Sequence, residues 1–193
     1  MNKSEEKLNE VNPKGEVIGI VSRSNAIDNS VLLQAVQLWI INPKTKEVLM
    51  QKRTKNKDVD PGMIDICSGH VLSGESPIQA VLREANEELG ILPENLMSKL
   101  KDLGKVEVDF SKVGRKGRYI AYEYIAFLDY PLDYYTKQDE EVDELFWMSY
   151  EDVKKAIQNG DQNMRIPYNE DTKRILDMID KKIKELDRNN EER

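Results

Sequence analysis

The chain has 193 residues, of which 39% are hydrophobic and 34% are charged, and its formal net charge is -7. This length suits one domain with a core of its own, and the composition is too apolar for a disordered chain. Acidic residues outnumber basic ones, whereas a protein that binds duplex DNA carries basic excess. We therefore expect no nucleic-acid partner.

Cysteine content and hydropathy predict a cytoplasmic location. The single cysteine, Cys67, excludes an intrachain disulfide and fits a reducing compartment. The first sixteen residues are charged and lack the apolar segment of a signal peptide. The longest apolar-rich stretch, residues 31–41, is too short to span a bilayer, so we expect no membrane partner.

The N-terminal residues 1–14 are mostly Lys, Glu and Asn, and they predict a flexible tail before a single domain over residues 15–193. Apolar and β-branched runs predict strands at residues 17–21, 32–41, 48–51, 63–67, 106–110, 118–128 and 144–148. Residues 32–41 are apolar on both faces, so this strand is expected near the centre of a sheet.

The strongest helix signal follows Ser76. Ser76 is a suitable N-cap, Pro77 fits the first helical position, and Gln79 completes a capping box. Apolar residues recur at helical spacing up to the natural stop at Gly90. Two later helices are predicted, one capped by Ser149 and ending near residue 158, and an amphipathic one over residues 171–186. The order of strands, helix, strands and helices predicts an α+β fold.

Three carboxylates share one face of the helix after Ser76. Glu84 and Glu88 are four residues apart and Glu84 and Glu87 are three apart, so their side chains are neighbours. A cluster of hard oxygen ligands on a rigid helix suits Mg²⁺ or Mn²⁺. The alternative is a solvated acidic face, which is what charge runs usually form.

The segment GHVLSGESPIQAVLREANEELGI, residues 69–91, decides between these readings because it resembles the Nudix box, GX5EX7REUXEEXGU with U apolar. The fixed positions of the box are filled by Gly69, Glu75, Arg83, Glu84, Glu87, Glu88 and Gly90. Ala85 and Ile91 fill the apolar positions. The chain therefore resembles the Nudix hydrolases, and the order of predicted strands around the box is similar to that of the family.

This resemblance implies an α/β/α sandwich with a mixed sheet, and a Mg²⁺-dependent attack of water on a diphosphate linkage. By position, Glu84, Glu87 and Glu88 would bind the metal, with the Gly69 carbonyl as a further ligand, and Mn²⁺ as a substitute ion. Glu75 and Arg83 would form a supporting ion pair.

The resemblance also places the general base after the box in many members. The segment QDEEVDELFWMS offers Glu141 and Glu144, besides Glu87 within the box. A carboxylate at one of these positions would take a proton from the attacking water.

A second segment, residues 51–71, resembles the bacterial Nudix branch that is similar to isopentenyl-diphosphate isomerase. That isomerase needs a cysteine directly before the Gly-His pair and several metal-binding histidines. Here Ser68 precedes Gly69 and His70, Cys67 is displaced by one residue, and the chain has no other histidine. The histidine cage of the isomerase therefore cannot form.

We expect a small-molecule partner: a nucleoside diphosphate derivative or another organic diphosphate. Arg53, Lys57 and His70 are the candidate substrate-binding residues, since cations and hydrogen-bonding groups contact phosphates. Two alternatives remain, an isomerase of prenyl diphosphates and a non-catalytic nucleotide-sensing module. The C-terminal amphipathic helix also leaves a homodimer open.

Overall fold

The computed structural model describes residues 5–28, 31–57 and 59–191. Within these residues the strands form one nine-stranded sheet. The strands are β1 (Lys7–Val11), β2 (Val17–Ser22), β3 (Leu32–Ile41), β4 (Glu47–Arg53), β5 (Ile64–Asp65), β6 (Cys67–His70), β7 (Lys101–Asp109), β8 (Arg118–Phe127) and β9 (Val142–Ser149). The α-helices are α1 (Arg23–Asp28), α2 (Pro77–Leu89), α3 (Pro93–Leu96), α4 (Tyr150–Gln158) and α5 (Glu170–Glu191).

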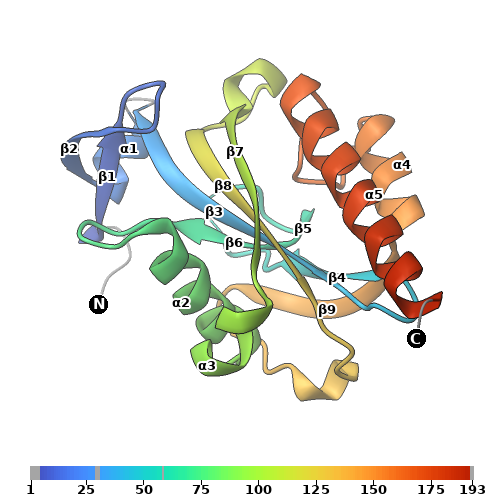
Figure 1. Cartoon of the computed structure of the whole chain (residues 1–193). Helices are drawn as coiled ribbons and strands as arrows, with labels where there is room; N and C mark the ends of the chain where they lie inside the picture. The colour runs from blue at the N-terminus through green and yellow to red at the C-terminus, as the bar shows by residue number, and fades with distance from the viewer. Residues whose placement is uncertain (1–4, 29–30, 58, 192–193) are drawn as a thin grey trace.

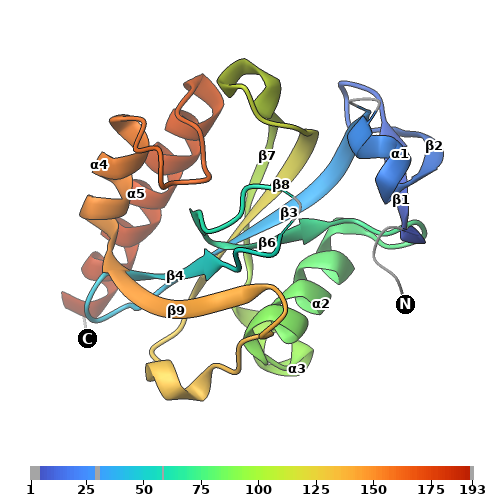
Figure 2. The ribbon, with the colours of Figure 1, turned by 180° about the vertical axis from the view of Figure 1, so that it is seen from behind.

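Strand β3 lies at the centre of the sheet, as its apolar faces predict. It pairs in parallel with β8 along its whole length and antiparallel with β6 and β4. Strand β8 pairs with β7, and β4 pairs with β9 and β5, so the sheet is mixed. Helices α4 and α5 lie on one face of this sheet and α2 and α3 on the other (Figures 1 and 2). The predicted α+β fold with an α/β/α arrangement is confirmed.

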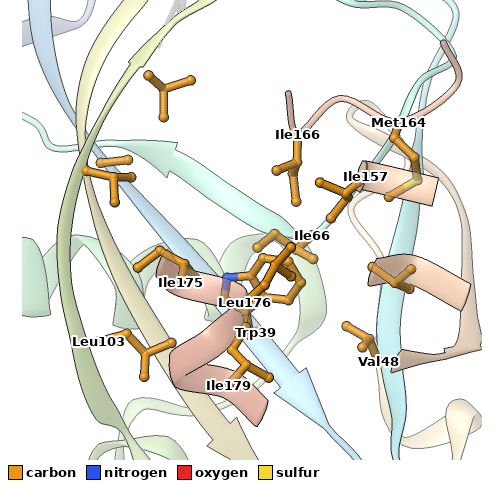
Figure 3. Packing of buried hydrophobic residues seen from close by; sticks show 14 of the residues in the cluster. Trp39, Val48, Ile66, Leu103, Ile157, Met164, Ile166, Ile175, Leu176 and Ile179 are labelled. Carbon is orange, nitrogen blue, oxygen red and sulfur yellow. The ribbon is translucent and has the colours of Figure 1, made fainter. Parts of the chain in front are cut away.

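Two separate cores explain why β3 is apolar on both sides. Successive side chains of a strand point to opposite faces. Leu38 and Ile40 join the core beneath α2, whereas Trp39 and Ile41 join the core beneath α4 and α5. Figure 3 shows Trp39 surrounded by residues of α5, among them Leu176 and Ile179. Helices therefore pack against both faces of the sheet, and β3 and its neighbours hold the adjoining loops in fixed positions.

Helix α2 has the ends that its sequence predicts. Ser76 accepts a hydrogen bond from the Gln79 backbone, and the Gln79 side chain accepts one from Ser76, which completes the capping box. Gly90 ends the helix with φ 69°, a left-handed conformation that glycine adopts without a steric penalty. Its Ala80, Val81, Ala85 and Leu89 side chains are buried against the sheet. The opposite side of the helix is left free to carry charged groups.

The prediction of a flexible tail over residues 1–14 is wrong for Lys7–Val11, which form β1. Leu8 is completely buried, and the Asn9 amide donates a hydrogen bond to the Gln34 side chain at 3.1 Å. Pairing with β2 and β3, the buried Leu8 and the contact between Asn9 and Gln34 therefore order a segment that looks solvated by composition. Residues 1–4 lie outside the described residues.

Other boundaries differ in smaller ways. The strand predicted at residues 63–67 is two short strands, β5 and β6, because the Asp65 side chain accepts a hydrogen bond from the Ile66 backbone at 2.9 Å. Strand β7 begins at Lys101, five residues before the predicted start, and helices α1 and α3 were not predicted. Among the described residues, no helix has the length and apolar character needed to cross a membrane.

Candidate active site

A cavity opens where α2 meets the sheet. Its walls include residues of β3, β6 and β8, the middle and second half of α2, Arg53 at the end of β4, and loops that carry Lys57, Glu141 and Arg165. Glu84 and Glu87 of the predicted metal site line it, as do Gly69 and His70. The structure thus brings residues from many separate parts of the chain around one space.

Arg83 organises the carboxylates at this cavity. Its Nε and Nη2 atoms donate to the two oxygens of Glu75 at 2.8 and 3.0 Å, which is a bidentate ion pair. Its Nη1 atom donates to Glu84 at 2.7 Å and to Glu87 at 3.1 Å, and Nη2 also reaches the His70 carbonyl at 2.9 Å. The Glu75–Arg83 pair is therefore present, and it ties the loop before α2 to the helix.

Glu84 and Glu88 form a buried pair of like charges. Burial and the Glu88 carboxylate raise the pKa of Glu84, against the opposing effect of Arg83. Burial also raises the pKa of Glu88, which is 2% exposed. The pKa values stay raised although Arg83 contacts Glu84, so two carboxylates one helical turn apart in this setting favour the further positive charge that a divalent cation would supply.

Gly69 makes room for the Glu84 carboxylate. A Cβ atom built on Gly69 would collide with the carboxyl group of Glu84. The absence of a side chain at this position lets the Glu84 oxygens lie directly against the backbone of β6. Glu84 and the Gly69 carbonyl, both expected to be metal ligands, can lie side by side only if residue 69 has no side chain.

Glu88 is held from two sides. The buried Gln51 side chain on β4 donates to Oε2 of Glu88 at 3.1 Å, and the Ser68 backbone N–H donates to the same oxygen at 3.2 Å. The Oε1 atom of Gln51 is buried and has no hydrogen-bond partner in the described structure. Gln51 was not singled out from the sequence, although an uncharged polar residue inside an apolar strand run is a signal for such a role.

No metal-ligand group is pre-assembled here: in residues 5–28, 31–57 and 59–191, no three His, Cys, Asp or Glu side chains are placed to hold one ion. The reason lies in Arg83, whose Nη1 atom contacts both Glu84 and Glu87. The Glu87 side chain is 44% exposed, and its carboxylate contacts Arg83. The donors nevertheless suit a hard cation, since they are carboxylate and carbonyl oxygens beside an unpartnered amide oxygen.

The structure places the two candidate bases after the box, Glu141 and Glu144, in different surroundings. Glu141 lines the cavity, and its carboxylate binds the Lys57 ammonium at 2.5 Å. Glu144 is exposed on β9, opposite Lys52, and is not part of the cavity wall. The placement of Glu144 therefore gives no support to a role in the reaction.

All three candidate substrate-binding residues, Arg53, Lys57 and His70, line the cavity. The Arg53 guanidinium donates to the carbonyls of Val59 and Asp60, and burial together with Arg165 lowers its pKa. Burial and the surrounding cations, Arg23 and Arg165 first among them, hold the pKa of His70 well below its usual range. The lowered pKa favours the neutral imidazole, whose Nε2 atom is buried and has no hydrogen-bond partner among the described residues.

Cys67 is a structural residue. It is 3% exposed on β6 and is absent from the cavity wall. Burial and the Glu88 and Glu84 carboxylates raise the pKa of its thiol well above the ordinary value. Nothing in this setting favours the acid that the isomerase chemistry needs.

Several cavity residues escaped the sequence reasoning. Arg23 comes from α1, where it pairs with Glu6 at 2.9 Å, Tyr119 comes from β8, and Arg165 comes from the loop between α4 and α5. These three residues lie far apart in the sequence and share no periodic signal, so their convergence is visible only in three dimensions.

Known proteins match most of the chain. A model of the NUDIX domain matches residues 31–168. Nudix hydrolase 3 of Arabidopsis thaliana is 29% identical over 91% of this chain, which corresponds to only 23% of the plant protein. A Clostridium acetobutylicum protein described as an uncharacterized Nudix hydrolase is 28% identical over 80% of this chain and 75% of its own length.

Solved structures share the fold. The protein DR0079 from Deinococcus radiodurans has a TM-score of 0.58 and 20% identity over 80% of this chain and 90% of its own. A bifunctional NMN adenylyltransferase/ADP ribose pyrophosphatase from Francisella tularensis, complexed with AMP and a Mn ion, has a TM-score of 0.54 and 20% identity. That likeness covers 77% of this chain and 41% of the Francisella protein.

Proposed function

The chain belongs to the NUDIX family as a Nudix hydrolase, and from this premise we propose that it hydrolyses a diphosphate linkage with the help of Mg²⁺. The substrate is a nucleoside diphosphate derivative or another organic diphosphate. Mn²⁺ is expected to replace Mg²⁺, because both ions accept the same oxygen donors.

The buried Glu84–Glu88 pair beside Gly69 is the observation that carries the proposal. Burial raises the pKa of both carboxyl groups, and the missing side chain of Gly69 leaves space at the Glu84 oxygens. Such an arrangement costs stability in a protein without a cation, and it is the arrangement that a cation-dependent site requires. Glu87 is the third expected ligand, and it contacts the same Arg83 nitrogen, Nη1, as Glu84 does.

Each side chain then has a separate task. When bound, the metal ion neutralises phosphate oxygens and acidifies a water molecule. Arg83 holds Glu84 and Glu87 in place through its contacts with Glu75 and the His70 carbonyl. Glu141 is the base that takes the proton from the attacking water, because it is the candidate carboxylate after the box that lines the cavity.

The charge of the wall supports a substrate with phosphate groups. Arg53 and Lys57 line the same cavity as the helix carboxylates Glu84 and Glu87, and guanidinium and ammonium groups bind phosphate oxygens. The Francisella protein is described as an ADP ribose pyrophosphatase and is complexed with AMP, so ADP ribose is the first compound to assay here.

Replacement of Glu88 by Gln tests the proposal. The wild-type chain, assayed with Mg²⁺ against a panel of nucleotide and non-nucleotide diphosphates, is expected to release a phosphate-containing product, and Glu88→Gln is expected to lose most of that turnover. Glu94→Gln, at an exposed carboxylate on α3, is the control. Equal turnover in Glu88→Gln and wild type contradicts the metal site.

The same panel separates the two alternatives. A nucleotide-sensing module would be stabilised against heat by a compound without cleaving it. An isomerase would move a double bond in a prenyl diphosphate and release no phosphate. Either result, with no hydrolysis of any compound, would overturn the proposed activity.

A further inference from the structure

Arg165 lies in the loop between α4 and α5, far along the chain from the box, and lines the same cavity as Glu84 and Glu87. Its backbone N–H donates to the Ile64 carbonyl at 2.8 Å, and Ile64 donates to the Asn163 carbonyl at 2.7 Å. The loop between α4 and α5 is therefore fastened to β5. This attachment carries the Arg165 side chain, which is 13% exposed, into the space between the sheet and the loop.

The partner of Arg165 is Asp65, a carboxylate with no exposed surface. Nη1 of Arg165 donates to Oδ2 of Asp65 at 2.9 Å, and Nε donates to Asp60 at 3.0 Å. Asp65 also accepts hydrogen bonds from the Ile66 backbone and from the Ser68 hydroxyl. A buried carboxylate needs this positive charge, since a carboxylate without a partner is strongly disfavoured in a protein interior.

Ser68 connects this ion pair to the box. Its hydroxyl donates to Oδ2 of Asp65 at 3.1 Å, and its backbone N–H donates to Oε2 of Glu88 at 3.2 Å. The next residue in the chain is Gly69, whose lack of a side chain makes room for Glu84. An unbroken series of contacts therefore runs from Arg165 through Asp65 and Ser68 to Glu88.

We propose that Arg165 is a positioning residue for the metal site: by balancing the charge of Asp65 it fixes Ser68, and Ser68 fixes the Glu88 carboxylate and the adjoining Gly69. The inference rests on the proposed function, because it takes Glu88 as a metal ligand. It adds that the loop after α4 sets metal affinity, although no residue of that loop contacts Glu88 in the hydrogen bonds described above.

The test measures Mn²⁺ binding to the full chain by titration calorimetry or by the electron paramagnetic resonance of free Mn²⁺, without substrate. Arg165→Met is expected to weaken Mn²⁺ binding about 10- to 100-fold, the usual effect of removing a residue that supports a metal ligand. Arg188→Met, at an exposed arginine on α5, is the matched control and keeps wild-type affinity.

A double variant separates positioning from a general loss of structure. In Asp65→Asn with Arg165→Met, the buried carboxylate is gone together with its cation, while the Asn oxygen still accepts from Ser68. This double variant is expected to recover most of the Mn²⁺ affinity that Arg165→Met loses. Under steady-state turnover, Arg165→Met is expected to raise the half-saturating Mg²⁺ concentration more than it lowers kcat at saturating Mg²⁺.

Unchanged Mn²⁺ affinity in folded Arg165→Met, or a double variant as weak as the single one, overturns the inference. If Arg165→Met does not fold, Ser68→Ala decides, since it cuts the same series of contacts without removing a charge. Ser68→Ala with wild-type affinity then overturns the inference. A wild-type chain that binds no Mn²⁺ removes the proposed metal site itself, and this result is distinct from a failure confined to Arg165.

Discussion

The Glu84 carboxylate occupies the space that a side chain on residue 69 would take, so Glu84 and Gly69 form a matched pair across α2 and β6. Gly69 does not need to be glycine for its backbone angles, because its φ lies outside the left-handed region that favours glycine. The constraint is steric and comes from one side chain. The pair therefore links a position in a strand to the charge cluster on the helix.

Gly69→Ala is predicted to displace the Glu84 carboxylate and to leave the fold intact. A misplacement on the order of 1 Å at a reacting centre costs about 100-fold in kcat/KM. Mn²⁺ affinity and kcat/KM are the measurements, with circular dichroism to check the fold. Gly19→Ala is the control, because the Cβ atom added there comes no closer than 2.9 Å to Glu10, whereas at Gly69 it would lie 2.0 Å from the Glu84 carboxyl group. Wild-type kinetics in Gly69→Ala would show that the Glu84 carboxylate can move aside without loss of activity.

Divalent ions are predicted to raise the melting temperature of the wild-type chain. A ligand at about 100 times its Kd stabilises the folded state by about 2.7 kcal/mol. For a domain of this size that corresponds to roughly 5–10 °C in Tm. Glu88→Gln is predicted to lose this increase, since the buried carboxylate pair is broken. The same increase in wild type and variant would mean that the ions bind elsewhere.

Local signals account for what the sequence predicts well. The bounds of α2 follow from a capping box and a terminal glycine within fifteen residues, and β3 follows from an apolar run with two buried faces. The sequence does not predict the ordering of Lys7–Val11, because that strand depends on partners in β2 and β3. Short polar strands have too little apolar pattern to be recognised alone.

In the candidate site, too, some residues can be predicted from the sequence and others cannot. The carboxylates of the helix share one turn and are evident from spacing, whereas Arg165 meets Asp65 across 100 residues of sequence. One signal was available for Asp65 and for Glu123: each is a lone carboxylate in an apolar strand segment, and each is fully or almost fully buried. A charge in such a setting predicts a buried partner, although not which residue provides it.

Glu141 and Glu144 provide a comparison within one segment. If Glu141 takes a proton from the attacking water, Glu141→Gln is predicted to lower kcat by about 100- to 10,000-fold, the usual contribution of a general base. Glu144→Gln is predicted to keep wild-type kcat, because Glu144 is exposed and is not part of the cavity wall. Similar kcat values for both variants would move the base to another group, with Glu87 the next to replace.

Glu123 is predicted to make stability depend on pH. Burial raises its pKa to about 8, although its carboxyl group accepts a hydrogen bond from Trp39 at 3.0 Å. In the unfolded chain a Glu ionises near pH 4.5, so between that pH and about 8 the folded state holds a proton that the unfolded state releases. The free energy of unfolding therefore falls as pH rises through this window, by an amount on the order of a few kcal/mol.

Glu123→Gln isolates this effect, since the amide oxygen can still accept from Trp39 and carries no charge. The variant is predicted to gain stability relative to wild type at pH 8.5 and to gain little at pH 5, as measured by urea unfolding at both values. The direction follows from the raised pKa: the wild-type stability is complete below about pH 4.5, where both states hold the proton, and is lost as pH rises to about 8, because the unfolded chain releases the proton first. An equal difference between the two proteins at pH 5 and pH 8.5 would show that Glu123 titrates as an exposed carboxylate does, and that burial does not keep it neutral.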